Sequence, residues 1–172
     1  PVFGVTMGLT NGQIASFLTA TILGSAAAIW PIGRLSDRMD RRMVMAGLML
    51  ASACVELLLM TFGRLPVWGM YALGFMLGMV SMTIYSVAVA HANDRAIAEQ
   101  SVTIASGLLF LYSIGAIAGP SIAASVMDRF GPTSLFLFMA CIHALALAVA
   151  ILRIRQRPPA AAKTESENAM PP

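Results

Sequence analysis

Charged side chains are scarce in this sequence. The 11 Lys and Arg residues and the 8 Asp and Glu residues make up only 11% of its 172 positions, whereas 58% of the positions are hydrophobic and the mean hydropathy is +0.79. An ordinary soluble domain carries about 25% charged residues, because its surface must be solvated. The low charge content therefore excludes an ordinary soluble domain and indicates an integral membrane protein.

The sequence also lacks the side-chain groupings that many enzymes require. Its two cysteines, Cys54 and Cys141, both fall in long apolar runs, which argues against the disulfide framework of a small secreted domain. There is no Cys/His cluster, no phosphate-binding P-loop and no Gly-x-Ser-x-Gly segment. We therefore expect no enzyme, no metal site and no cofactor, and the net charge of +3 calls for no nucleic-acid partner.

What the sequence has instead is a series of apolar runs as long as a bilayer is thick, since a spanning helix needs roughly 20 apolar residues. Separators rich in Gly, Pro or charge divide the runs, as expected where helices end. The runs do not alternate as the short strands of a membrane β-barrel would. The predicted fold class is an all-α integral membrane bundle with five complete transmembrane helices and a partial one. The predicted spans are 1–9 (partial), 13–33, 43–62, 66–90, 101–127 and 133–152.

The two ends of the sequence differ from these spans. Residues 156–172 are rich in Pro, Ala and polar residues, which predicts a disordered tail. The sequence begins without Met and part-way through an apolar segment, so we expect the N-terminal part of a longer protein to be missing. Residues 1–155 are then the transmembrane unit.

Basic residues are divided unevenly between the two sides of the predicted bundle. Positive residues stay on the cytoplasmic side of spans, so the richer side, which includes the C-terminus, is predicted to face the cytoplasm. This implies a multi-pass protein of the cytoplasmic (inner) membrane. Only Arg64 and Arg129 fall on the other side. Nine of the 11 Lys and Arg residues fall on the cytoplasmic side: Arg34, Arg38, Arg41, Arg42, Arg95, Arg153, Arg155, Arg157 and Lys163.

The densest group of charges is the stretch GRLSDRMDRR at residues 33–42, predicted to be a short cytoplasmic loop. It resembles the motif G-x-L-(a)-D-R-x-x-R-(R/K), which follows the second helix of each six-helix half in the major facilitator superfamily. A second stretch, GAIAGP, resembles the G-x-x-x-G-P element of that family through Gly115, Gly119 and Pro120. The positions that match the loop motif are Gly33, Leu35, Asp37, Arg38, Arg41 and Arg42.

The resemblance covers about residues 1–155 and implies one half of a twelve-helix bundle. The first half of the family typically carries an arginine in its fourth helix, and 66–90 has none. The segment AVAHANDR resembles a loop in the second half of a poorly characterised bacterial branch of these transporters. We therefore identify helices seven (partial) to twelve, the C-terminal half.

The resemblance implies a secondary active transporter that moves a small solute by alternating access, coupled to an ion gradient. The implied partners are the missing N-terminal half, the solute, a proton as the candidate coupling ion, and the lipid bilayer. The alternative is a non-transporting membrane sensor or assembly protein that keeps the same scaffold.

Two hypotheses account for the loop motif. Its arginines can anchor helix ends at an anionic leaflet, at about 1 kcal/mol each. The resemblance further implies that Asp37 contacts the N-terminus of a helix in the missing half when the cytoplasmic side is closed, with Arg38 and Arg41 holding its carboxylate in place. A contact that exists in one state alone would bias an alternating-access equilibrium.

Polar side chains inside the spans are the candidates for a solute pathway. The glycine pairs Gly4/Gly8, Gly74/Gly78 and Gly115/Gly119 instead have the spacing of close helix packing. The runs 43–62 and 133–152 are the most uniformly apolar, and the family's corresponding helices are peripheral. Helical spacing selects as the pathway candidates Gln13, Ser16, Ser81, Tyr85, Ser106, Tyr112 and Ser113.

Isolated ionisable residues occur in both of the most apolar spans, 43–62 and 133–152. A carboxylate inside a membrane is a candidate proton relay, but Glu56 lies about two turns from the end of its predicted span, so the simpler expectation is that it reaches the interface. His143 is expected to pack among apolar residues or to bond a backbone carbonyl. His91 and Asp94 are expected to cap a helix end.

Overall fold

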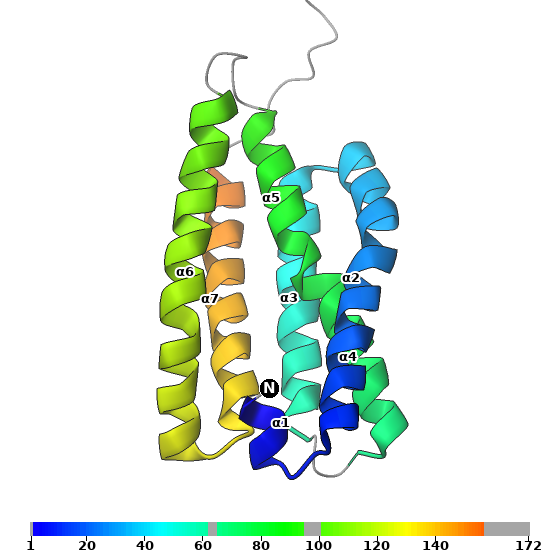
Figure 1. Cartoon of the computed structure of the whole chain (residues 1–172). Helices are drawn as coiled ribbons and strands as arrows, with labels where there is room; N and C mark the ends of the chain where they lie inside the picture. Colours follow the sequence, from blue (N-terminus) through cyan, green and yellow to red (C-terminus); the bar gives the residue numbers. More distant parts are fainter. Residues whose placement is uncertain (1, 62–64, 95–100, 157–172) are drawn as a thin grey trace, which may run out of the picture.

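The computed structural model describes residues 2–61, 65–94 and 101–156 (Figure 1). In these parts of the chain every regular element is a helix, and five helical units are long and apolar enough to cross a membrane, with α4 and α5 counted as one unit. This confirms the predicted all-α bundle of five spans. The helices are α1 (Val2–Thr6), α2 (Asn11–Arg38), α3 (Arg41–Leu59), α4 (Val67–Ser81), α5 (Thr83–Asn93), α6 (Ser101–Phe130) and α7 (Ser134–Gln156).

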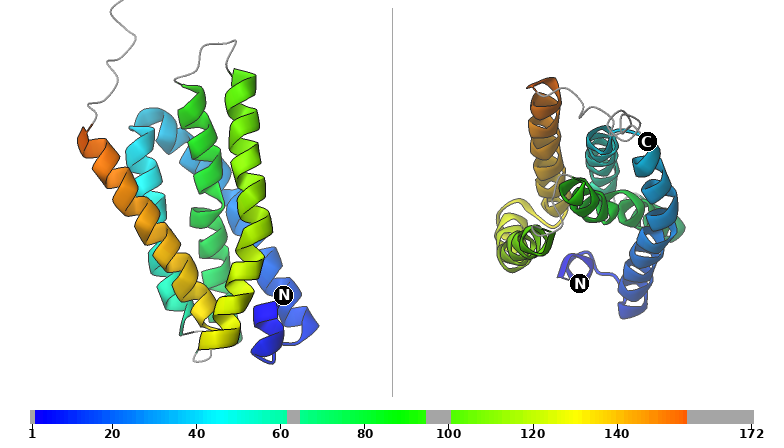
Figure 2. Two further views of the ribbon diagram at one scale, coloured as in Figure 1. Left: turned by 90° about the vertical axis from the view of Figure 1, so that its left-hand side faces the viewer. Right: turned by 90° about the horizontal axis from the view of Figure 1, so that it is seen from above.

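The five spans form a bundle with two sides (Figure 2). Seen from above, α3 and α7 lie on one side of the α4–α5 unit, and α1 and α6 lie on the other. The closest packing joins α2 to α4 and α3 to α7, and α3 also contacts α4 and α5. Helix α3 therefore finds its neighbours within this chain, whereas none of the described residues of α6 is buried.

Glycine allows the α2–α4 contact to be unusually close. A Cβ at Gly24 would overlap the backbone carbonyl of Phe75, and one at Gly78 would overlap the backbone of Thr21. A Cβ at Gly74 would press on the side chains of Phe17 and Thr21, at 2.8 and 3.3 Å. Because lipid is as apolar as a helix surface, helices in membranes associate through such close van der Waals contact. The predicted packing role of Gly74 and Gly78 is confirmed.

The span predicted at 66–90 is not one continuous helix. It is divided at Met82 into α4 and α5. The hydroxyl of Thr83 donates to the carbonyl oxygens of Met79 and Val80, at 2.7 and 3.2 Å, and so bonds backbone groups at the interruption. Side-chain bonding of this kind competes with the regular helical pattern and bends helices. No Pro or Gly marks the interruption, which is why the sequence did not predict it.

Helix α2 also begins and ends outside its predicted bounds of 13–33. Asn11 and Gly12, which precede the predicted span, are its first residues, and the turn before it contains Gly8 at φ +74°. Thr10 is the N-cap: its hydroxyl accepts from the Gln13 amide at 3.3 Å, while the Gln13 side chain accepts from the Thr10 amide at 2.9 Å. This reciprocal capping box stabilises the helix start.

The connection between α6 and α7 is a tight turn. Helix α6 continues to Phe130, beyond its predicted end at residue 127, and Gly131 follows at φ +88° with its amide bonded to the carbonyl of Met127 at 2.9 Å. Glycine adopts this left-handed conformation without a steric penalty, so it ends helices efficiently. Helix α7 then runs to Gln156, four residues past its predicted end, and the tail predicted beyond it lies outside the described residues.

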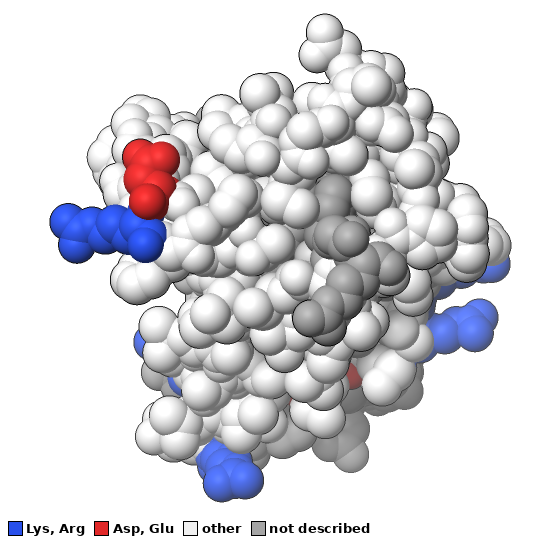
Figure 3. Space-filling model, turned by 90° about the horizontal axis from the view of Figure 1, so that it is seen from below, with Lys and Arg blue, Asp and Glu red and all other residues white. Residues whose placement is uncertain are grey.

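The described charges gather at one end of the bundle. Apart from Glu56, Asp128 and Arg129, they all lie at the α2–α3 turn, in the last turns of α2 and α7, or just after α5. Figure 3 looks at the opposite end, whose near surface is mostly uncharged. The described charged residues at this end are Asp128 and Arg129. The asymmetry on which the predicted orientation rests is therefore present in the folded chain.

Candidate functional site

The stretch 33–42 is mostly helical rather than a loop. Its first six residues form the end of α2, only Met39 and Asp40 lie between the helices, and Arg41 begins α3. Asp40 is the N-cap of α3, because its carboxylate accepts from the Arg42 amide at 2.9 Å. The sharp α2–α3 connection thus fixes Asp37 and Arg41 on adjoining helix ends.

Arg41 joins this connection to the end of α5. Its Nη2 donates to Asp37 Oδ1 at 2.9 Å, and its Nε lies 2.9 Å from Asp94 Oδ2. The Arg41 side chain is 21% exposed, whereas Asp37 and Asp94 are 66% and 51% exposed. No hydrogen bond or ion pair joins Arg38 to Asp37 in the described chain, so Arg41 alone holds that carboxylate here. The sequence did not predict the Arg41–Asp94 pair.

Of the remaining motif residues, Gly33 and Leu35 lie at an open surface or beside a small space between α2 and α5, whereas the Arg42 side chain is only 12% exposed. Leu35 is 46% exposed, and a Cβ on Gly33 would meet no atom within 4 Å. Gly33, Asp37 and Arg41 help to line a cavity of about 210 Å³ between these helices. Arg34 stacks on Trp30, with its guanidinium carbon 4.4 Å from the ring centroid, a cation–π contact typical of helix ends near a membrane surface.

Two of the predicted pathway residues meet across α5 and α6. The rings of Tyr85 and Tyr112 have centroids 5.3 Å apart, and the side chains are 42% and 59% exposed. Ser16 and Ser106 are exposed on α2 and α6. Both tyrosines therefore contribute polar groups to a surface that the described chain leaves uncovered.

Three other pathway candidates bond within their own helix or turn toward another one. Gln13 belongs to the capping box at the start of α2, and the Ser113 hydroxyl donates to the Leu109 carbonyl at 2.8 Å. Ser81 instead lies 3.5 Å from Nε2 of His143 on α7, measured from its Oγ.

Glu56 and His143 form a buried pair between α3 and α7. His143 Nδ1 is 2.9 Å from Glu56 Oε2, and the Glu56 side chain is 0% exposed. The expectation that Glu56 reaches the interface is wrong, and so is the expectation that His143 packs alone or bonds a carbonyl. The sequence contained a usable signal, because a lone acid and a lone imidazole in apolar spans each need a partner.

The glycines of the GP element have no neighbour in the described chain. A Cβ on Gly115 or Gly119 would meet nothing within 4 Å. Pro120 follows inside α6 without ending the helix. The packing predicted for Gly115 and Gly119 thus has no partner among the described helices.

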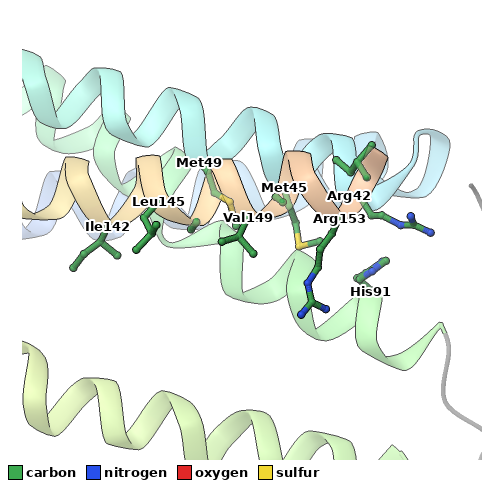
Figure 4. A pocket seen from close by; sticks show the side chains of 11 residues that line it. Arg42, Met45, Met49, His91, Ile142, Leu145, Val149 and Arg153 are labelled. Carbon is green, nitrogen blue, oxygen red and sulfur yellow. The ribbon is translucent and has the colours of Figure 1, made fainter. Parts of the chain in front are cut away.

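A larger groove is lined mainly by α3 and α7, and His91 of α5 also lines it. It encloses about 630 Å³, and its walls are apolar residues such as Met45, Leu145 and Val149. Figure 4 shows the basic residues Arg42, His91 and Arg153 together toward one end of the groove. Such walls suit apolar chains better than a polar solute.

The comparisons with known proteins agree with the motif. The family model of the Major Facilitator Superfamily matches residues 1–171. The chain belongs to the major facilitator superfamily. No solved structure matches it significantly.

Two similar superfamily members are bacterial proteins whose names call them uncharacterized. The chain is 27% identical over 143 residues to an "uncharacterized MFS-type transporter" of Yersinia pestis (strain Pestoides F), which covers 81% of this chain and 35% of the relative. It is 26% identical over 161 residues to the "uncharacterized MFS-type transporter YcaD" of Salmonella typhi, and this aligned region covers 92% of this chain and 40% of the relative. The chain thus spans well under half the length of these relatives.

Proposed function

We propose that this chain is the C-terminal six-helix half of a secondary active transporter, which moves a small solute across the cytoplasmic membrane by alternating access. The observation that carries the proposal is the uncovered face formed by α1, α2, α5 and α6, with α6 unburied along its described length. Family membership and the 35–40% coverage of the relatives also support it. A second half packed on this face would cover the open glycines of α6.

The proposed orientation places the Arg41 cluster and the C-terminus in the cytoplasm. The end-to-end charge asymmetry supports it, because basic residues stay on the cytoplasmic side of membrane spans. The nearly uncharged end then faces outward.

The proposed gate is Asp37. Its carboxylate is largely exposed and is oriented by Arg41, so it can meet the positive N-terminus of a helix in the other half. Such a contact would hold the cytoplasmic side closed and break when that side opens. We propose that Gly33, Leu35, Arg38 and Arg42 shape and anchor the same helix ends.

The proposed solute pathway follows the uncovered face. Tyr85, Tyr112, Ser16 and Ser106 supply polar groups there, with Ser113 on the same helix as Tyr112. The apolar groove lined mainly by α3 and α7 includes none of these pathway residues and would face lipid. A transported solute would therefore contact the tyrosine pair and not Met45 or Leu145.

The proposal is tested by a solute screen on the full-length protein that contains this chain. A ligand present at 100 times its Kd should stabilise the folded protein by about 2.7 kcal/mol, which a thermal-shift assay detects. Solutes that stabilise it are then assayed for counterflow in proteoliposomes. Saturable counterflow that falls in Asp37→Asn protein, while binding persists, supports transport.

The sensor or assembly alternative predicts a different result from the same screen. A sensor would bind a solute without counterflow, and an assembly protein would bind none. Either result, obtained with correctly inserted protein, would contradict the proposed transport.

A further inference from the structure

The buried pair of Glu56 and His143 extends to a third helix. Glu56 Oε2 on α3 is 2.9 Å from His143 Nδ1 on α7, and His143 Nε2 is 3.5 Å from the hydroxyl of Ser81, the last residue of α4. The side chains of Glu56 and His143 are 0% and 17% exposed. Carboxyl, imidazole and hydroxyl are thus arranged in series across three helices, with the Ser81 hydroxyl at the outer limit of hydrogen-bond distance from the imidazole.

Burial constrains the charge of this chain. A carboxylate beside a neutral imidazole would leave one uncompensated negative charge in a site of low dielectric, at a cost of several kcal/mol. One added proton makes the pair neutral overall. Glu56 Oε1 is buried and has no hydrogen-bond partner among the described residues, an arrangement that suits a neutral acid better than an anion, whose two oxygens both need donors.

We propose that Glu56 and His143 form a proton-binding site that exchanges its proton past Ser81. In the loaded form the Glu56 carboxylic acid donates from Oε2 to Nδ1, and the neutral imidazole carries its proton on Nε2. On release, the Oε2–H bond breaks as an Nδ1–H bond forms, and the Nε2 proton leaves to water on the Ser81 side. The products are a carboxylate, a neutral imidazole protonated on Nδ1, and one free proton.

The α4–α5 interruption places this site beside the moving parts of the proposed transporter. Ser81 lies directly before the break at Met82, and Tyr85, one turn after it, contacts Tyr112. A change of angle between α4 and α5 would move the Ser81 hydroxyl relative to His143 and so couple proton release to opening. The coupling, unlike proton binding itself, rests on the proposed function.

Among the described residues, no other ionisable group takes part in the pair. The charged and titratable residues at the α2–α3 end are far from this site along their helices. Arg42 is 14 residues from Glu56, His91 is ten residues from Ser81, and Arg153 is ten residues from His143. In the described chain no hydrogen bond or ion pair joins the pair to the remaining titratable or charged side chains of α3 to α7, which are Cys54, Tyr71, Tyr85, Tyr112, Asp128, Arg129 and Cys141.

Infrared difference spectroscopy of the full-length protein in lipid nanodiscs tests the site without a known solute. A protonated carboxylic acid has its own carbonyl stretching band, which disappears when the proton is released at higher pH. We expect such a band in the wild type and its loss in Glu56→Gln, which keeps the size and hydrogen bonding of the side chain. The number of protons released as the pH is raised, measured in parallel, should be lower by one per polypeptide in Glu56→Gln than in the wild type.

Two further variants separate proton binding from packing. Ser52 lies one turn before Glu56 and is equally buried, and its hydroxyl has no partner among the described residues, so Ser52→Ala should leave the band unchanged. In His143→Asn the acid has lost its imidazole, and the band should persist at the pH that removes it from the wild type. A structural role alone would not make the band disappear in Glu56→Gln and persist in His143→Asn.

The proposal is overturned if the wild type shows no carboxylic acid band, or if Glu56→Gln leaves the titrating band intact. Loss of the band on adding sodium at constant pH would also overturn it, since the site would then bind a metal ion. A titrating band in a protein that shows no counterflow would support the proton site while contradicting the proposed transport.

Discussion

Replacing Arg41 should loosen the cytoplasmic end of the proposed transporter, whereas replacing Arg38 should not. Both changes, made as Arg→Gln, remove one positive charge from the same stretch, so they alter membrane orientation equally. They differ in contacts, because Arg41 bonds Asp37 and Asp94 at 2.9 Å each, and Arg38 forms no ion pair in the described chain. The pair of variants therefore separates a topological role from a structural one.

The expected magnitude follows from exposure. Exposed ion pairs contribute about 0.2–1 kcal/mol each. Asp37 and Asp94 are 66% and 51% exposed, so both pairs are partly screened, although Arg41 itself is only 21% exposed. Loss of both contacts should total about 1 kcal/mol. Because Arg41 orients Asp37 for the closed gate in this proposal, that loss falls on the closed state and shifts the open–closed equilibrium about fivefold. High salt should reduce the difference, because screening weakens exposed pairs.

The assay uses a single cysteine at Ser106, near the start of α6, in the full-length protein. Inverted membrane vesicles are treated with a membrane-impermeant maleimide, and the rate of labelling reports cytoplasmic opening. Arg41→Gln should raise that rate about fivefold, and Arg38→Gln by less than twofold. Equal increases in the two variants, or none in either, would refute the idea that Arg41 organises the gate.

Three further predictions concern topology, packing and assembly. Cysteines at Arg38 and Arg95 should be labelled only from the cytoplasm and one at Arg64 only from outside; labelling of all three from one side would contradict the helix order. Gly78→Ala should lower thermal stability by about 1–3 kcal/mol through overpacking against α2. Gly107→Ala is the control and should have no such effect, because a Cβ there meets nothing within 4 Å. Equal melting temperatures of the two variants would argue against the close contact. Residues 1–172 alone should carry no solute flux and should recover it when the other half is co-expressed; flux by this chain alone would rule out the two-half account.

The sequence predicted the spans because each is a long apolar run, and lipid permits little besides helix there. It also predicted Gly74 and Gly78 as packing residues, since small residues four apart create a flat strip. The capping box of Thr10 and Gln13 was visible as T-x-x-Q, but the predicted span began only at residue 13. The break at Met82 was not visible, because it depends on how the Thr83 hydroxyl bonds the preceding turn.

The buried pair and the Arg41–Asp94 bridge could not be derived from periodicity. Periodicity assigns a residue to a face of its own helix but not to a neighbouring helix, and Glu56 and His143 are 87 positions apart. Their pairing depends on α3 packing against α7, and the bridge depends on α5 ending beside the α2–α3 turn. Both are properties of the assembled bundle.

Two-sided labelling of Tyr112 tests the central claim most directly. This residue lies near the middle of α6 on the uncovered face, so alternating access predicts that a single cysteine there reacts with impermeant reagents from either side of the membrane. Asp37→Asn should raise labelling from the cytoplasm about fivefold and lower it from outside, as expected for loss of about 1 kcal/mol from the closed gate. Labelling from one side alone, unchanged by Asp37→Asn, would contradict an alternating-access transporter.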